Sequence, residues 1–576
     1  MTEHKLISLS SLTEDKIYSF EVNNKSLILI KNGLDLSVFD AACPHQGASL
    51  ANGHLENNKI VCPLHGRTFS CSDGKNSEHN SNLNSYPTLI KNDEVFVIIR
   101  DEKNESNTTK KIIESKDLPT PKGKFILGNL PEFNAENKHQ ILENWVNREN
   151  NIVQISLMGK KFIVSGDESI NTEILKQRPD NFRRYHKMEE IMEEMSVNGV
   201  FGKEGEEWKK HRKITQEALN LKNVKSFFPT LEKMTNRLHK RWNTAAKNNT
   251  AIDIQKEMMR YTVDITTFIA FGYDSNTLEK DNDLIQNHLS KIFPMINKRI
   301  TAPLPLWRFI KSKQDKELDA AINSLEKVIT EFINEARKRR ENNTTLKENP
   351  SNFLEALLTE QEKDSSFSDN DIFGNVFTML LAGEDTTSNS ISWTLYFLAT
   401  HPKCFTKVRE EADQLTSNIV INDVNLLPQL RYTEAVCTES MRIKPTTPTL
   451  YMQANHDITV EHLHLKKGET VMLQNKVAQT DEKNFSNPDE FKPERWLETC
   501  PHHRNHKPEA LRVFGGGPRY CPGKNLAMHE MLICISMIAK NFDIELAVSP
   551  DEIKESFAFT MYPKNLLINL KMREKS

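Results

Sequence analysis

The chain has 576 residues, of which 37% are hydrophobic and 27% are charged, and its formal net charge is -3. This composition predicts a globular protein longer than one ordinary domain. The near-neutral charge argues against a nucleic-acid-binding protein. Residues 1–12 lack the apolar core of a signal peptide, and no run of about 18 apolar residues occurs, so we expect a cytoplasmic protein without a membrane span.

The first hundred residues contain short apolar runs separated by turn residues. Runs at residues 16–22, 26–30, 36–39 and 94–100 alternate or cluster apolar side chains between Asn, Gly and Asp. That spacing is typical of short strands joined by tight turns. We therefore predict a small all-β domain over residues 1–102.

Two Cys-His pairs lie inside this segment, in Cys43-Pro-His45 and Cys62-Pro-Leu-His65. Two thiolates and two imidazoles are ligands of a zinc site or of an iron-sulfur cluster. The spacing differs from that of zinc fingers, and Cys-x-His with Cys-x-x-His-Gly resembles the Rieske ferredoxin family. The resemblance implies that Cys43 and Cys62 bind one iron of a 2Fe-2S cluster, and His45 and His65 the other. Zinc remains the alternative, and Cys71, a core or surface thiol, has no assigned partner.

Four positions depart from the high-potential Rieske pattern. Ala48 and Leu64 stand where that pattern has an extra disulfide, and Arg67 and Phe69 replace a serine and a tyrosine. Fewer hydrogen bonds to the cluster sulfurs lower its reduction potential. The segment therefore resembles the soluble low-potential ferredoxins that supply oxygenases.

Residues 103–117 are polar and have no periodic apolar pattern, so we predict a flexible linker. A tether of about fourteen residues spans roughly 20 Å on average. It would hold a partner domain at an effective concentration of about 1 mM. Pro119, Pro121 and Gly123 then open the second domain, which we place at residues 118–576.

Helical periodicity dominates from Lys138 onward. One long helix is predicted between a capping box at Ser368 and Asp371 and the break before Pro402. It would be roughly 45–50 Å long. Its middle reads Ala382-Gly-Glu-Asp-Thr-Thr387, where glycine and threonine weaken the helix. A packing notch and a functional groove are both compatible with that composition.

The stretch Phe514-Gly-Gly-Gly-Pro-Arg-Tyr-Cys-Pro-Gly523 places one cysteine among four glycines. The glycines let the backbone pass close to a flat, bulky group, which predicts a metal-ligand loop. The pattern Phe-x-x-Gly-x-Arg-x-Cys-x-Gly resembles the haem-ligand loop of cytochrome P450 monooxygenases. The resemblance implies a mainly α fold with minor β-sheet and haem b, whose axial ligand is the Cys521 thiolate. It also implies that Arg519 pairs with a haem propionate and that Phe514 packs on the thiolate side of the ring.

Two further motifs stand in the order of the same family. Trp208 and Arg212 lie one helical turn apart, and the resemblance assigns both to the haem propionates. Asp385 and Thr386 match the family's acid-alcohol pair, which manages protons during O2 activation. Without the family pattern, Trp-x-x-x-Arg would be no more than part of an amphipathic helix.

Glu439, Arg442 and Arg495 resemble the buried, structural Glu-Arg-Arg cluster of the family. Met452-Gln453 stands where many relatives have a propionate-binding arginine, so haem anchoring would depend more on the other arginines. The run His502-His-Arg-Asn-His506 imitates a metal cluster, but a solvated loop is the expectation.

Lys209, Lys210, Lys213 and Lys524 are expected on the thiolate face of the haem domain. Electrostatic docking of the ferredoxin unit on this face is one interpretation, and a solvated run of charges is the other. Whether the unit docks on its own haem domain or on a neighbour's is open at this point.

These features predict a multidomain oxygenase in which a Rieske 2Fe-2S domain passes electrons to a cytochrome P450 domain. That domain would insert one oxygen atom from O2 into an apolar substrate, such as a fatty acid, terpenoid or sterol-like compound. Residues 445–451 and 556–562 are candidates for the pocket wall. No Gly-x-Gly-x-x-Gly begins a βαβ unit, so an external NAD(P)H-dependent flavoprotein reductase is the expected partner.

Three other functions compete with this prediction. A non-catalytic redox or gas sensor could use the same cofactors. A haem-thiolate peroxygenase or isomerase would need neither the ferredoxin domain nor the acid-alcohol pair. A Rieske non-haem dioxygenase would need two histidines and a carboxylate on iron, for which the sequence offers no convincing candidate.

Overall fold

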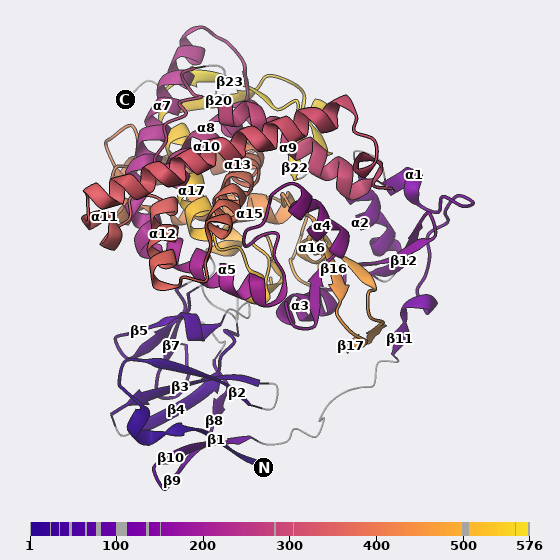
Figure 1. Ribbon diagram of the computed structural model, residues 1–576. Helices are drawn as coiled ribbons and strands as arrows, with labels where there is room; N and C mark the ends of the chain where they lie inside the picture. The colour runs from indigo at the N-terminus through magenta and orange to yellow at the C-terminus, as the bar shows by residue number, and fades with distance from the viewer. Residues whose placement is uncertain are drawn as a thin grey trace.

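A computed structural model of the chain has an N-terminal part made of strands and a larger, mainly helical part (Figure 1). It describes residues 2–22, 25–33, 35–44, 49–63, 66–76, 82–99, 112–133, 137–149, 151–280, 284–302, 304–497, 506–558 and 560–573. Among the helices in these ranges, none is both long enough and apolar enough to cross a bilayer.

Antiparallel sheets form the N-terminal domain, with strand orders β2-β3-β4-β8, β1-β10-β9 and β5-β6-β7. This confirms the predicted all-β domain. The strands are β1 (Thr2–Ser8), β2 (Ile17–Val22), β3 (Lys25–Asn32), β4 (Asp35–Asp40), β5 (His54–Glu56), β6 (Lys59–Val61), β7 (Thr68–Ser70), β8 (Ser85–Tyr86), β9 (Thr88–Lys91) and β10 (Glu94–Ile99).

Strand β3 explains how this small domain forms two apolar clusters. Successive side chains of a strand point to opposite faces of its sheet. Ile28 and Ile30 therefore join one cluster, which also contains Cys43 and Cys62. Leu27 and Leu29 join the other cluster, which also contains apolar side chains of β10. The strand is buried on both faces, and it anchors the cysteine-bearing side of the domain.

The larger domain is built mainly from helices, as predicted. They are α1 (Leu130–Phe133), α2 (Lys138–Arg148), α3 (Glu168–Lys176), α4 (His186–Glu194), α5 (Gly205–Ala218), α6 (Leu221–Ser226), α7 (Phe228–Lys247), α8 (Ile254–Phe271), α9 (Leu284–Thr301), α10 (Lys313–Asn342), α11 (Thr345–Glu348), α12 (Phe353–Lys363), α13 (Asp369–Thr400), α14 (Pro402–Leu415), α15 (Arg431–Ile443), α16 (Asn475–Gln479) and α17 (Lys524–Asn541).

Short strands complete the larger domain. Its main sheet has the order β12-β13-β19-β16-β14. The strands are β11 (Ile113–Glu114), β12 (Ile152–Leu157), β13 (Lys160–Ser165), β14 (Phe182–Arg184), β15 (Ile252–Asp253), β16 (Thr449–Ala454), β17 (Ile458–Val460), β18 (Leu463–Leu465), β19 (Thr470–Gln474), β20 (Phe542–Leu546), β21 (Lys554–Phe557), β22 (Met561–Lys564) and β23 (Leu567–Met572).

Helix α13 is the long helix that the sequence predicts. Ser368 and Asp371 form the complete capping box, and the helix has 32 residues, which corresponds to about 48 Å. It packs against α8 at Gly383, where an added Cβ would lie 2.8 Å from Oγ1 of Thr266. Glycine therefore permits the close approach of the two helices, and the packing notch suggested by the sequence exists.

The last residues of the expected linker 103–117 belong to the larger domain. Strand β11 pairs in parallel with β18, and the Ile113 N–H donates to the His462 carbonyl at 2.8 Å. Ser115 begins a short 3-10 helix, and its carbonyl accepts from Gln154 at 2.8 Å. Backbone hydrogen bonds thus fix residues 113–117, which a polar composition alone does not predict. Residues 100–111 lie outside the described ranges.

Candidate active site

The loop that carries Cys521 leads directly into the N-terminus of α17. The backbone N–H of Cys521 donates to the carbonyl of Phe514 at 2.8 Å, which closes the loop. Gly517 has a φ of +64°, and a Cβ there would lie 2.2 Å from the carbonyl oxygen of Leu175 in α3. Glycine tolerates both the positive φ and the close approach of the carbonyl, because it has no Cβ.

The thiol of Cys521 lies among groups that favour its anion. Burial raises the pKa of this thiol, whereas the Gly523 backbone N–H, Arg212 and Lys524 lower it. The thiolate is the form that binds metals, and a bound metal ion itself deprotonates a coordinating thiol. The loop is therefore suited to hold a metal-bound thiolate.

Helix α5 brings Trp208 and Arg212 to this loop, and both side chains are buried. Arg212 Nη1 donates to the carbonyl oxygen of Tyr520 at 2.6 Å. Within the described residues, Arg212 Nε and Nη2 have no hydrogen-bond acceptor. A buried guanidinium with two unused donors matches the two oxygens of a carboxylate.

Glu204 lies beside three arginines, of which sequence reasoning identified only Arg519; Arg178 and Arg519 have buried side chains, and the Arg184 side chain is 12% exposed. Arg519 forms an ion pair with Glu204, and its guanidinium lies 4.8 Å from the ring centroid of Trp208. Arg178 Nη2 is 3.1 Å from Glu204 Oε1, and Arg184 Nε is 3.9 Å from the same oxygen. Burial lowers the pKa of Arg178 to about 10. One carboxylate is therefore the shared counter-charge of three guanidinium groups.

Arg178 and Arg184 also line a cavity beside α13, and in the described part of the chain their Nε atoms have no hydrogen-bond acceptor. Together with Arg212 and Arg519, they give four cations against the single carboxylate of Glu204. The excess charge suits a ligand with two carboxylates. No local pattern identified Arg178 or Arg184, because one lies in a loop and the other in the short strand β14.

Thr386 lies on the cavity wall, in the middle of α13. Its hydroxyl donates to the carbonyl oxygen of Ala382 at 2.7 Å. This is a local threonine-to-backbone bond, of the kind by which threonine weakens a helix interior. It uses the hydroxyl proton, so the Thr386 oxygen remains an acceptor on the cavity wall.

The carboxylate of Asp385 is bonded to two groups that sequence reasoning missed. Thr560 donates its hydroxyl to Asp385 Oδ2, and Asn389 Nδ2 donates to Oδ1 at 3.2 Å. Burial raises the pKa of Asp385, and these two hydrogen bonds lower it. Thr560 lies between β21 and β22, 175 residues beyond Asp385, so no sequence motif joins the two.

The cavity, together with the solvent space at its opening, has an empty volume of about 1070 Å³. Hydroxyls come from Thr378, Thr386, Thr447, Thr449, Tyr451 and Thr560, and three cations also line the cavity, whereas the rest of the wall is apolar. Both stretches that the sequence proposes for the wall contribute to it. The apolar lining includes Met188, Met192, Val197, Phe201, Ile296, Ile300, Leu381, Leu450, Met452 and Phe557.

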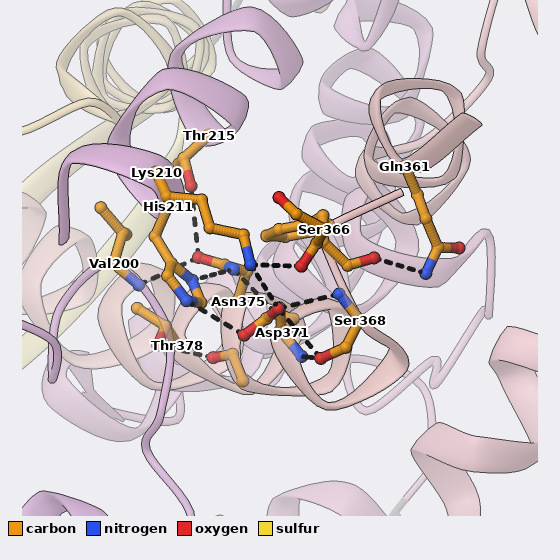
Figure 2. Close-up of polar contacts among 12 residues, drawn as sticks. Val200, Lys210, His211, Thr215, Gln361, Ser366, Ser368, Asp371, Asn375 and Thr378 are labelled. Atoms are coloured by element: carbon orange, nitrogen blue, oxygen red, sulfur yellow. Dashed lines mark hydrogen bonds and ion pairs between the residues drawn. The ribbon is translucent and has the colours of Figure 1, made fainter. Parts of the chain in front are cut away.

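A buried polar network joins α5 to the first turns of α13 (Figure 2). Asn375 Nδ2 donates to Nδ1 of His211 at 2.7 Å, and Nε2 of His211 lies 3.2 Å from Asp371 Oδ1. Burial lowers the pKa of His211, which keeps the imidazole neutral. Lys210, which lies on α5 next to His211, also donates to Asp371 at 3.1 Å. The network therefore fixes α5, which contacts the Cys521 loop, relative to α13, which forms part of the cavity wall.

Glu439, Arg442 and Arg495 come together in a second buried cluster. Glu439 accepts from Arg442 Nε and Nη2 at 2.9 and 2.8 Å and from Arg495 Nε at 2.9 Å. Trp496 Nε1 donates to the same carboxylate at 2.8 Å. None of these residues lines the cavity beside α13; Arg442 also donates to the Gln479 carbonyl at 2.8 Å, which joins α15 to α16.

The four lysines expected on the thiolate face have different surroundings. Lys209 pairs with Glu206 at 2.8 Å, and Lys210 pairs with a carboxylate of its own domain. Lys213 is exposed. Only Lys524 of the four interacts electrostatically with a described cysteine of the N-terminal domain, Cys62.

Cys43 and Cys62 are 2% and 1% exposed and belong to one apolar cluster of the N-terminal domain. Cys43 follows β4 and Cys62 follows β6, which belong to different sheets, and the two cysteines meet in the apolar cluster of the domain. His45 and His65, the other expected ligands, lie outside the described residues. The cysteine half of the expected ligand set is thus placed within one cluster.

Three features that the sequence left open have structural roles. Cys71 is buried in the N-terminal core. His506 stacks on Phe485 with ring centroids 5.8 Å apart, whereas residues 502–505 of the same run lie outside the described ranges. Gln453, at the position where relatives have an arginine, donates to the Gly468 carbonyl at 2.8 Å.

Comparison with known families identifies both parts of the chain. Residues 118–570 match the family Cytochrome P450. The chain belongs to the cytochrome P450 family. Residues 2–87 match the Rieske [2Fe-2S] domain. These matches confirm the predicted combination of domains, the haem-thiolate and 2Fe-2S cofactors, and a cytochrome P450 monooxygenase.

Several curated relatives are similar to the cytochrome P450 part. Protein LUTEIN DEFICIENT 5, chloroplastic, of Arabidopsis thaliana is 26% identical over 430 residues, which cover 71% of this chain and 70% of that protein. Cytochrome P450 94A1 of Vicia sativa is 26% identical over 452 residues, 74% of this chain and 85% of that protein. Self-sufficient cytochrome P450 monooxygenase CYP505E5 of Aspergillus niger is 24% identical over 445 residues, 75% and 41% of the two chains.

The site residues fit the two cofactors of these families. The buried arginines have unused donors for the two propionates of haem, and Cys521 offers a thiol among groups that stabilise its anion. Cys43 and Cys62 offer two thiols to one centre. When bound, a thiolate-ligated haem supplies O2 chemistry and a 2Fe-2S cluster supplies one electron at a time.

Proposed function

We propose that the chain is an NAD(P)H-dependent monooxygenase that hydroxylates an apolar substrate. An external flavoprotein reductase would supply electrons through the chain's own Rieske domain, and the cytoplasm is the proposed location. The observation that carries the proposal is the cavity beside α13, whose mostly apolar wall is interrupted by Thr386 and by Thr560, the partner of Asp385.

The proposed domains are a Rieske domain at residues 1–102, a linker that begins at residue 103, and a cytochrome P450 domain that reaches residue 576. We assign Cys521 as the haem ligand and Asp385 with Thr386 as the catalytic pair. The proposed cluster ligands are Cys43, His45, Cys62 and His65, and the proposed haem-contacting residues are Trp208, Arg212, Phe514, Arg519, Arg178 and Arg184.

Asp385 and Thr560 provide a path for protons to the cavity. The Thr560 hydroxyl donates to Asp385 Oδ2 and also lies on the cavity wall. When Asp385 Oδ2 carries a proton, the carboxyl donates to Thr560 Oγ1 and the Thr560 hydroxyl turns toward the cavity, so the proton can pass to Oγ1 while the hydroxyl proton moves into the cavity. Burial raises the pKa of Asp385, which makes its carboxyl a proton carrier nearer to neutral pH.

The cavity wall favours a fatty acid over a terpenoid or a sterol-like compound. Lys138 lies on the wall, with its ammonium 4.9 Å from the ring centroid of Phe557 and 5.5 Å from that of Phe133. Burial lowers the Lys138 pKa to about 8, so the ammonium is mostly charged at neutral pH. A carboxylate at one end of an apolar chain complements this wall.

The loaded enzyme, with a flavoprotein reductase, NAD(P)H and O2, tests the proposal directly. Fatty acids that shift the ferric haem spectrum should be hydroxylated in steady turnover. Products formed with hydrogen peroxide but never with the reductase would indicate a peroxygenase. Binding or redox responses without any product would indicate a sensor.

Lys138→Met tests the substrate class. It should weaken the binding of a fatty acid by about tenfold or more, as expected for a charge-assisted contact, and leave the alcohol of the same chain length unaffected. Lys161→Met, at an exposed lysine on β13, is the matched control. Equal effects on the acid and the alcohol would contradict a carboxylate contact.

A further inference from the structure

The side chain of Tyr520, which immediately precedes Cys521, packs into the apolar core of the N-terminal domain. It is 8% exposed and belongs to the same cluster as Cys43, Cys62, Leu50 and Ile60. Among the described residues of the larger domain, Tyr520 alone is a buried member of that cluster. In Figure 1 the N-terminal strands lie beneath the helical body, below α5.

Helix α5 holds Tyr520 from the haem-domain side. The Tyr520 carbonyl accepts from Arg212 at 2.6 Å, and its hydroxyl accepts from Gln216 Nε2 at 3.0 Å. The Arg212 guanidinium lies 4.3 Å from the centroid of the tyrosine ring. The ring is therefore fixed on one domain and inserted into the core of the other. One peptide bond separates it from the residue that supplies the haem thiolate.

Lys524 lies beside the same loop, as the first residue of α17. Its ammonium is 5.7 Å from the ring centroid of Phe514, and Cys62 of the N-terminal domain and Cys521 of its own domain both act on its charge. Lys524 therefore carries a positive charge near cysteines of both domains.

We infer that Tyr520 and Lys524 form the docking point for the chain's own Rieske domain, so that electrons pass within one chain and not between two. This rests on the proposed function, in which the Rieske domain supplies the haem. In the step concerned, one electron leaves the reduced cluster and ferric haem becomes ferrous, and the external reductase restores the electron. Tyr520 and Lys524 act as positioning residues, because they hold the two centres together.

The full-length enzyme with both cofactors tests this assignment under carbon monoxide, without substrate or O2. After rapid reduction of the cluster, formation of the ferrous carbon monoxide complex measures electron arrival at the haem. The rate constant should not change when the enzyme is diluted. A rate that rises in proportion to enzyme concentration would overturn docking within one chain.

Three variants test the two residues. Tyr520→Ala and Lys524→Gln should each slow haem reduction by about tenfold or more, as for truncation of a central interface residue, whereas Tyr520→Phe should keep most of the rate. Lys213→Gln, which removes an exposed lysine of α5, is the matched control. If Lys524→Gln and Tyr520→Ala reduce the haem at the parent rate, the docking point is wrong.

Two readouts separate a docking defect from loss of a cofactor. The electron paramagnetic resonance signal of the cluster and the carbon monoxide spectrum of the haem should persist in each variant. Hydrogen exchange of β6, which carries Ile60 of the shared core, should become faster in Tyr520→Ala, and unchanged exchange would contradict the insertion of the ring. Fast, dilution-independent haem reduction without any product would refute the proposed function and leave the docking intact.

Discussion

Replacing Thr560 by valine tests the proton path most sharply. The change keeps the shape of the side chain and removes the hydroxyl that donates to Asp385 Oδ2. A hydrogen bond to a charged group contributes about 1.5–3 kcal/mol, which corresponds to about one to two pKa units. Because this bond lowers the pKa of a carboxyl that burial has already raised, its loss raises the pKa further. The Asp385 carboxyl of the variant therefore stays protonated to a higher pH.

The assay is the ratio of product formed to NAD(P)H consumed, measured across the neutral pH range. In Thr560→Val this ratio should fall, and the midpoint of its pH dependence should move upward by about one to two units. Thr378→Val is the matched control, because Thr378 lines the same cavity while its hydroxyl donates to the Gly374 carbonyl at 2.7 Å. An unshifted midpoint, or the same change in both variants, would refute the reasoning.

Four further changes have distinct expected outcomes. Thr386→Ala should lower the yield of product per NAD(P)H without preventing substrate binding, and unchanged coupling measured by product analysis would remove Thr386 from the proton path. Cys521→Ala should abolish the red-shifted Soret band of the carbon monoxide complex and keep the resonance signal of the cluster; survival of the Soret band would disprove the ligand assignment. His45→Ala should abolish the resonance signal, keep the Soret band and stop reductase-driven turnover. Glu439→Ala should lower the free energy of unfolding by about 3–5 kcal/mol, because it leaves two buried arginines without a counter-charge. Urea denaturation would measure this loss. The control is Glu482→Ala, at an exposed site, where a loss of less than about 1 kcal/mol is expected.

Local patterns predicted the parts of the site that local chemistry determines. The capping box at Ser368 and Asp371 marked the start of α13, because a helix N-terminus needs side-chain acceptors for its free N–H groups. The glycines before Cys521 marked a close backbone approach, which the contact of Gly517 with α3 explains. In both places the chemical requirement and the residues that meet it are neighbours in the sequence.

Long-range partners could not be predicted in the same way. Asp385 depends on Thr560, which a different part of the chain brings to α13. Arg178 and Arg184 become site residues only because Glu204 and the cavity wall lie beside them. An arginine in a loop or a threonine in a turn carries no local signature, since its role is decided by tertiary packing.

The boundary of the linker shows the same limit at the level of secondary structure. Ile113 follows a polar, charged segment, and nothing in its neighbourhood indicates a strand. Its partner strand β18 lies some 350 positions later in the chain. Composition predicts that a tether exists, but the ends of the tether depend on which distant strand offers hydrogen bonds.

The three arginines beside Glu204, together with Arg212, have a consequence for the abundance of the protein in the cell. Without the propionates of haem, the folded chain keeps buried cations that Glu204 alone cannot neutralise, and such charges are costly. A cofactor that binds only the folded state shifts the equilibrium away from unfolding, and quality control removes chains that unfold. If these arginines hold the propionates, the amount of protein that accumulates should follow the supply of haem, and the arginines would link the lifetime of the chain to its readiness for catalysis.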